Sequence, residues 1–192
     1  MQKLLFSLLS LALTVFPVQA ALQAGAQAPQ FSTQASLAGK DFHYALADAL
    51  QKGPVVVYFY PSAFTRGCNI QAHEFAEHID QFAAAGASVV GVSLDSIERL
   101  NAFSADPEYC AGKFPVASDA DGQIAKAFQL SVREARPGKK DSRGVEIDHG
   151  FAERTTFVIT QDGNIAAVLG GLSPSENVQQ ALASVKQLAG NG

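Results

Sequence analysis

The stretch from residue 55 to residue 68 constrains this chain more than any other, because an apolar run stops at a proline and a cysteine follows on a new element. Residues 55–60 read Val-Val-Val-Tyr-Phe-Tyr without polar alternation, which is typical of a strand buried on both faces. Pro61 has no backbone N–H and ends this strand. A strand of this kind predicts a sheet covered by helices on both sides, and hence an α/β domain.

The segment after Pro61 has the spacing of an amphipathic helix that ends just before Gly86. Thr65 is the predicted N-cap, so Cys68 falls in the first turn, where unpaired N–H groups and the helix dipole favour a thiolate over a thiol. Position alone leaves open that Cys68 is a small, buried and unreactive side chain. The apolar positions that define the helix are Ala72, Phe75, Ala76, Ile79, Phe82 and Ala83.

The pattern Pro61-x-x-x-Thr65-x-x-Cys68 resembles the active-site signature of the peroxiredoxins. The residues just before it, Phe59-Tyr60, match the usual strand end of that family. Four chemical types of residue (aromatic, Pro, Thr and Cys), at fixed positions over ten residues, make this match more specific than a cysteine alone.

Two further stretches, in the expected order, carry the same resemblance. Residues 25–31 are similar to the G-x-x-A-P-x-F entry of the family, and residues 154–159 resemble its arginine-bearing strand. The likeness runs from about Gly25 to the C-terminus and is greatest to the bacterioferritin comigratory protein, or Q-type, branch. It implies an α/β, thioredoxin-like fold, with a central mixed sheet flanked by helices and the N-terminal hairpin extension of peroxiredoxins.

The remaining segments alternate between strand and helix patterns, as such a fold requires. The predicted elements are a hairpin and short helix over 31–49, a strand over 87–94, a helix capped by Asp95 or Ser96 that runs to about 104, a brief strand over 114–117, a turn and short helix to 128, a surface loop over 131–150 at the rim of a site, strands over 155–160 and 164–169 joined at Asp162-Gly163, and a last helix from Ser173-Pro174 to Gly190.

Residues 1–20 have the pattern of a secretory signal peptide. Lys3 supplies a positive charge, residues 4–16 are apolar but too short to span a bilayer, and residues 18–20 form a small-residue cleavage site. The alternative is an uncleaved membrane anchor, which the short apolar length disfavours. We expect residues 21–26 to be a tether, residues 27–192 to form one peroxiredoxin domain, and the mature protein to be exported to the bacterial periplasm.

Composition argues against several other classes of function. The chain has a net charge of −4 and no basic run, so it offers no electrostatic footprint for nucleic acid or an anionic membrane. No metal, haem or flavin motif appears in the sequence, and no bound cofactor is expected. His73 with Glu77, and Glu74 with His78, have a spacing that could chelate a metal. Both pairs fall on the predicted polar face of the helix, where a solvated surface is the favoured interpretation.

The resemblance implies a role for each residue of the signature. A peroxide is broken by attack of a thiolate, and the expelled oxygen needs donors close by. Cys68 is implied as the peroxidatic nucleophile, Thr65 as a hydroxyl aimed at the sulfur and peroxide, Pro61 as a shield against water, and Arg154 as the cation beside both. Each neighbour also has a simpler explanation, which is helix capping for Thr65, strand termination for Pro61 and a surface position for Arg154.

The second cysteine decides how the cycle closes. Many Q-type members place a resolving cysteine five residues after the first, but this chain has His73 there. Other members use a cysteine ahead of a Phe-Pro pair such as Phe114-Pro115, so the resemblance implies that Cys110 resolves Cys68 through an intramolecular disulfide. A permanent disulfide between the two is the alternative and would stabilise the fold by about 4 kcal/mol. A transient bond predicts that the first turn of the Cys68 helix unwinds.

Three functions therefore compete. The first is a thiol peroxidase that reduces hydrogen peroxide and organic hydroperoxides, is recycled by a thioredoxin-like or other dithiol reductant, and works as a monomer or weak dimer. The second is a thiol–disulfide oxidoreductase, which lacks its Cys-x-x-Cys because Asn69, Ile70 and Gln71 follow Cys68. The third is a non-catalytic thioredoxin-like module with a structural Cys68–Cys110 disulfide.

Overall fold

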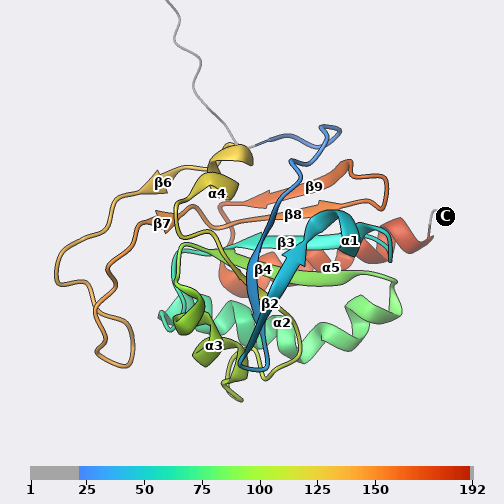
Figure 1. Cartoon of the computed structure of the whole chain (residues 1–192). Coiled ribbons are helices and arrows are strands. Elements are labelled where there is room, and N and C mark those ends of the chain that lie inside the picture. The colour runs from blue at the N-terminus through green and yellow to red at the C-terminus, as the bar shows by residue number, and fades with distance from the viewer. Residues whose placement is uncertain (1–21, 191–192) are drawn as a thin grey trace, which may run out of the picture.

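A seven-stranded mixed sheet with helices on both faces forms the centre of the computed structural model, which describes residues 22–190 (Figure 1). The predicted signal peptide lies outside these residues. The strand order is β2-β1-β5-β4-β3-β8-β9, with β6 and β7 in a separate ribbon. The elements are β1 (Ser32–Leu37), β2 (Lys40–Ala45), α1 (Leu46–Leu50), β3 (Val55–Phe59), α2 (Arg66–Ala84), β4 (Ser88–Ser93), α3 (Ile97–Ala105), β5 (Val116–Ser118), α4 (Gln123–Ala127), β6 (Val132–Arg133), β7 (Phe151–Ala152), β8 (Thr155–Ile159), β9 (Ile165–Gly170) and α5 (Pro174–Gly190).

The central strand β3 is buried on both faces, as its unbroken apolar run predicts. It pairs in parallel with β4 and antiparallel with β8. Val56 and Tyr58 contribute to one core cluster, with side chains of α2, α3 and α5, whereas Val55, Val57 and Phe59 contribute to the other, with side chains of α1 and α4. The strand therefore ties together the two apolar layers, and its C-terminal end, where the loop to α2 begins, is held from both sides.

The other predicted elements are confirmed with shifts of one or two residues at their ends. The N-terminal hairpin turns at Ala38 and Gly39, which both have positive φ, and β1 also pairs with β5. Helix α2 ends before Gly86, whose φ of 77° is the left-handed conformation of a glycine after a helix. The described residues contain no helix that is long and apolar enough to cross a membrane.

Two segments differ from expectation. The N-terminal stretch predicted as a tether is packed on the domain, because the amide of Gly25 donates to the carbonyl of Ile165 at 2.8 Å and Leu22 contacts the second core cluster. The predicted loop over 131–150 contains the ribbon β6–β7, which projects at the left of Figure 1. Each of its strands has only two residues, too few to leave a periodic pattern in the sequence.

Candidate active site

Cys68 lies in the first turn of α2, where the sequence predicted it, and only 2% of it is exposed. Thr65 takes the N-cap position with extended backbone, but its hydroxyl does not cap the helix. It donates instead to the carbonyl of Ser62 at 2.8 Å. The predicted N-cap position of Thr65 is thus confirmed, but its side chain makes no capping bond, and the first-turn N–H groups near Cys68 have no acceptor from it.

Arg154 reaches the sulfur of Cys68 from the short link between β7 and β8. The pairing of Phe59 with Thr155 places the residue before β8 next to the end of β3. From there Nη2 of Arg154 donates to Sγ of Cys68 at 3.4 Å. Gly67 leaves room for this approach, because a Cβ on it would stand 3.2 Å from the same Nη2. The sequence prediction that Arg154 and Cys68 meet is thus matched in the structure.

A chain of buried amides fixes the guanidinium. Nη1 of Arg154 donates to Oε1 of Gln71, and Nε2 of Gln71 donates to Oδ1 of Asn177 at 2.9 Å. The hydroxyl of Thr156 donates to the same Oδ1 at 2.6 Å, while Nδ2 of Asn177 donates to the carbonyl of Leu169 at 2.9 Å. Gln71 and Asn177 are fully buried. The sequence interpretation missed both, although a polar residue on the apolar stripe of a helix was the signal.

The segment between Pro61 and Thr65 is anchored by one buried carboxylate. Asp95 accepts from the hydroxyls of Ser62 and Ser93, from the amide of Ala63 and from Nε of Arg99, at 2.7 to 2.9 Å. Arg99 also donates to the carbonyl of Ala63 at 2.9 Å. Sequence reasoning considered Asp95 only as a helix cap. The cap of α3 is Ser96, and Asp95 instead holds the loop that leads to the cysteine.

His149 completes this ionic cluster as a cation. Its Nε2 faces Asp95 at 2.8 Å and its Nδ1 faces the carbonyl of Gly150 at 2.7 Å, so both ring nitrogens must donate. Burial alone would lower the pKa of His149, but the hydrogen bond and charge of Asp95 outweigh it and raise that pKa. Burial would likewise raise the pKa of Asp95, and the bond and charge of His149 lower it. The pair therefore favours the ionised forms of both groups.

Phe64 is the strained residue of the loop, with φ at +59°. Its carbonyl accepts from the amide and the hydroxyl of Ser142, at 2.9 and 2.8 Å. The guanidinium carbon of Arg143 lies 3.2 Å from the centre of its ring. The loop over 131–150 therefore covers the residue just before the N-cap of α2, in agreement with its predicted place at the rim of the site.

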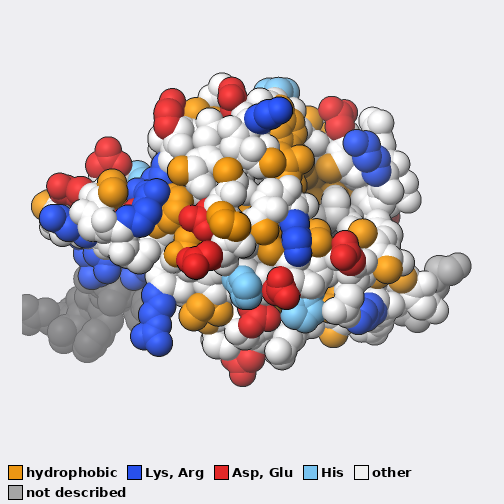
Figure 2. Space-filling view, turned by 90° about the horizontal axis from the view of Figure 1, so that it is seen from below, with side chains coloured by type: hydrophobic (Ala, Val, Ile, Leu, Met, Phe, Trp, Pro, Cys, Tyr) orange, Lys and Arg blue, Asp and Glu red, His pale blue; other side chains and the backbone are white. Residues whose placement is uncertain are grey.

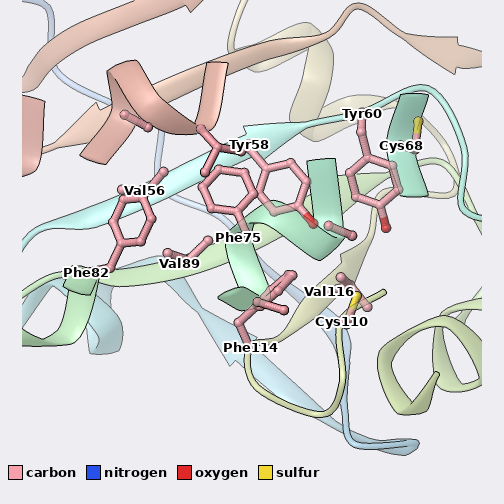
Figure 3. Packing of buried hydrophobic residues seen from close by; sticks show 14 of the residues in the cluster. Val56, Tyr58, Tyr60, Cys68, Phe75, Phe82, Val89, Cys110, Phe114 and Val116 are labelled. Atoms are coloured by element: carbon pink, nitrogen blue, oxygen red, sulfur yellow. The ribbon is translucent and has the colours of Figure 1, made fainter. Parts of the chain in front are cut away.

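Cys110 lies in the turn after α3 and is fully buried. It belongs to the same core cluster as Cys68, and both thiols are free. In Figure 3 the side chain of Tyr60 lies between the two cysteines. Burial, with the charge of Asp106, raises the pKa of the Cys110 thiol. In this conformation Cys110 is a neutral thiol that does not reach Cys68.

His73 occupies the position where many Q-type members carry their second cysteine, and it holds the Cys110 turn. Its Nδ1 donates to the carbonyl of Glu108 at 3.0 Å, and Nζ of Lys113 donates to the carbonyl of Ala76 at 3.0 Å. His78 bonds its own helix at the carbonyl of Glu74. Within residues 22–190 there is no group of three His, Cys, Asp or Glu side chains that could hold a metal.

Comparisons with known proteins agree with this geometry. The model of the AhpC/TSA family matches residues 24–168. Peroxiredoxin Bcp of Escherichia coli K12 is 33% identical over 88% of this chain and 98% of its own. The crystal structure of peroxidoxin BcpB from Mycobacterium tuberculosis superimposes with a TM-score of 0.72 at 28% identity, covering 87% of this chain and 98% of that one.

A structure of the Xanthomonas campestris bacterioferritin comigratory protein, studied for the alkyl peroxide reduction of that protein, gives a TM-score of 0.64 at 27% identity, over 81% of this chain and 91% of the other. These likenesses confirm the predicted thioredoxin-like fold. The chain therefore belongs to the AhpC/TSA family and to the bacterioferritin comigratory branch of the peroxiredoxins.

Proposed function

We propose that this chain is a thiol-dependent peroxidase in which Cys68 is the nucleophile. The observation that carries the proposal is the guanidinium of Arg154, 3.4 Å from Sγ at the start of α2. The thiolate attacks one oxygen of a hydroperoxide, the O–O bond breaks, and Cys68 becomes a sulfenic acid while the other oxygen leaves as an alkoxide or hydroxide and takes up a proton. Arg154 stabilises the charge on both sides of this step.

Thr65 and Pro61 complete the site. The hydroxyl of Thr65 now donates to Ser62, and rotation about χ1 turns it toward the sulfur and the bound peroxide. Pro61 is half-buried, lacks an N–H, and keeps its rigid ring beside the site, where it limits the access of water. Both roles follow from the family resemblance. The position of Thr65 directly before α2 also supports the role of its hydroxyl.

Cys110 is the proposed resolving residue. The Cys110 thiol loses its proton and its sulfur attacks the sulfenic sulfur of Cys68; the S–O bond breaks as the disulfide forms, and the expelled hydroxide takes up that proton to leave as water. A dithiol reductant then restores both thiols. Since both cysteines are buried and free, the first turn of α2 and the Cys110 turn must open before the sulfurs meet. A monomer or weak dimer suffices for this cycle because one chain carries both cysteines.

The test compares Cys110→Ser with Cys68→Ser after one equivalent of peroxide, with dimedone to trap sulfenic acid and mass spectrometry to locate it. We expect trapping in Cys110→Ser only, and a Cys68–Cys110 disulfide in the wild type that thioredoxin reduces. A wild type that neither consumes peroxide nor forms sulfenic acid at Cys68 contradicts the peroxidase. A disulfide that resists thioredoxin favours the non-catalytic module instead.

Export is part of the same proposal. The pattern of residues 1–20 supports a cleaved signal peptide, and the matched family segment starts only at residue 24. The mature protein then begins at Ala21 and works in the periplasm. Expression of the full chain in a Gram-negative host, with N-terminal sequencing of the periplasmic fraction, checks this. An intact Met1 terminus in the cytoplasmic fraction contradicts it.

A further inference from the structure

A pocket of about 440 Å³ opens beside the first turn of α2. Pro61 and Thr65 form the wall nearest the proposed nucleophile, and Phe151 adds an apolar surface. The loop over 131–150 closes the other side. The pocket thus touches two residues of the active-site signature, while it extends well beyond the space that hydrogen peroxide needs.

The pocket is strongly cationic although the whole chain is acidic. Five of its lining side chains carry a positive charge, and all five are exposed, in a chain whose net charge is −4. Figure 2 shows several Lys and Arg side chains, with some Asp and Glu side chains among them, at the left end of the molecule, where the β6–β7 loop projects. The five are Arg66, Arg133, Arg136, Lys139 and Lys140.

Asp and Glu side chains offset this group only in part. Within residues 22–190 none of the five cations forms an ion pair. The acidic lining residue, Asp141, is already bonded to Arg99 at 2.8 Å and Arg143 at 3.0 Å. On the same loop, Glu146 lies across an isolated antiparallel bridge from Lys140 and its carboxylate accepts from the amide of Gly138, so it lowers the positive charge on that side without forming an ion pair. Unpaired cations around a concave, partly apolar pocket are the features of a site for a small organic anion.

We propose that this pocket selects hydroperoxides that carry a carboxylate at a distance from the –OOH group. The cations bind the carboxylate, Phe151 and Pro61 contact the carbon skeleton, and the –OOH passes Thr65 to the sulfur of Cys68. The inference rests on the proposed peroxidase and names its substrate class. The concave shape and the apolar wall favour a small molecule over the acidic surface of a protein reductant.

The experiment uses two substrates that share one carbon skeleton and differ in whether the carboxyl group is charged or capped by a methyl ester. They are 4-(2-hydroperoxypropan-2-yl)benzoate and its methyl ester. The enzyme is the mature chain from Ala21 to the C-terminus, and thioredoxin is the reductant. A charged hydrogen bond contributes roughly 1.5–3 kcal/mol, so we expect kcat/KM for the acid to exceed that for the ester by about tenfold or more. Added salt lowers the ratio, because the pocket is open to solvent.

A triple variant tests the assignment of the ratio to the pocket. In Arg136→Gln/Lys139→Gln/Lys140→Gln we expect the acid-to-ester ratio to fall toward one. The matched control, Lys52→Gln/Lys126→Gln/Lys186→Gln, removes the same charge from outside the pocket and keeps the wild-type ratio. Circular dichroism and thermal unfolding verify that both variants are folded.

Each other outcome is separable. Equal rates for acid and ester, with hydrogen peroxide still consumed, overturn the inference and leave the peroxidase standing. Wild-type enzyme that consumes none of the three peroxides overturns the proposed function itself. An acid-to-ester ratio that falls equally in the control variant overturns the assignment to the pocket, because it shows that the overall charge of the protein attracts the anionic substrate. A triple variant that loses rate only in reduction by thioredoxin, with the ratio intact, assigns the cations to a reductant and overturns the inference.

Discussion

Cys68 and Cys110 are buried to nearly the same degree in one apolar cluster, yet the charged groups near their sulfurs have opposite sign. Cys68 lies at a helix start with a guanidinium 3.4 Å from its sulfur. Cys110 lies in a turn where burial and the charge of Asp106 raise the pKa of its thiol and keep it neutral. The contrast teaches that burial does not assign the roles of the two cysteines. We propose that the charged groups that face each sulfur do so.

The largest expected effect comes from removing the cation on the Cys68 side. Arg154→Met should slow sulfenic acid formation at Cys68 by about 10²–10³-fold, because a preorganised donor to the reacting atoms is lost. The rate in Arg154→Lys should lie between those of the wild type and Arg154→Met, since one ammonium group cannot bind both the sulfur and Gln71. Single-turnover kinetics in a Cys110→Ser background measure this. An unchanged rate in Arg154→Met would remove the main difference between the two sulfurs.

Alkylation compares the two cysteines directly. In the reduced native protein we expect iodoacetamide to modify Cys68 about a hundredfold faster than Cys110, because the thiolate is the reactive form. In guanidinium chloride the two rates should converge. Peptide mass spectrometry over a time course reads both sites in one sample. Faster native labelling of Cys110 would reverse the assignment of roles.

The dependence of stability on pH distinguishes the contacts that hold the Cys68 region from those that hold the Cys110 turn. Ionic contacts of Asp95 hold the Cys68 side, whereas backbone bonds hold most of the Cys110 turn. The raised pKa of His149 means that its contribution to folding is full below its unfolded value, about 6.5, and is lost as pH rises through the folded value. Deprotonation removes one hydrogen bond, so we expect a loss of about 1 kcal/mol in unfolding free energy.

Urea unfolding at several pH values, with His149→Gln as the reference, measures this loss. The variant should lack the decline above neutral pH. A wild type whose stability rises over the same range would show that the pair with Asp95 is not ionised in the folded protein.

The smallest effect concerns the charge beside Cys110. Asp106→Asn keeps an acceptor for the amide of Glu108 but removes the carboxylate that raises the pKa of the thiol. Disulfide formation after peroxide should then be about two- to threefold faster, as expected for one partly screened charge. Rapid acid quench, followed by alkylation of the remaining thiols and mass spectrometry, measures the rate. A slower step would mean that the turn, and not the thiol, limits resolution.

The sequence was sufficient for the parts of the fold that repeat a pattern. Residues 55–60 have an unbroken apolar run, and residues 66–84 an apolar stripe with a glycine after it, so β3 and α2 were predictable. Strands β6 and β7 were not, because two residues have no period. The turn at Asp162-Gly163 was predictable from turn chemistry alone.

The site was predictable only where the family resemblance reached. Nothing local distinguishes Arg154 from a surface arginine, since its partner is 86 residues away in the chain. Asp95 was interpreted as a helix cap because its partners come from separate segments of the chain. Gln71 and Asn177 left a usable signal, as buried amides on apolar helix faces, but the sequence does not say which groups they bond.

The left-handed backbone of Phe64 links the loop anchors to the opening that the second cysteine requires. A non-glycine residue in that region stores about 1–3 kcal/mol of strain, which the bonds from Ser142 and the contact with Arg143 now offset. Once those contacts part, Phe64 can relax to a negative φ, and we expect this change to loosen the start of α2. The strained residue of the closed form thus lies one residue ahead of the N-cap. We therefore expect the rate at which the first turn of α2 opens to depend on how stably Ser142 and Arg143, in the loop over 131–150, bind Phe64.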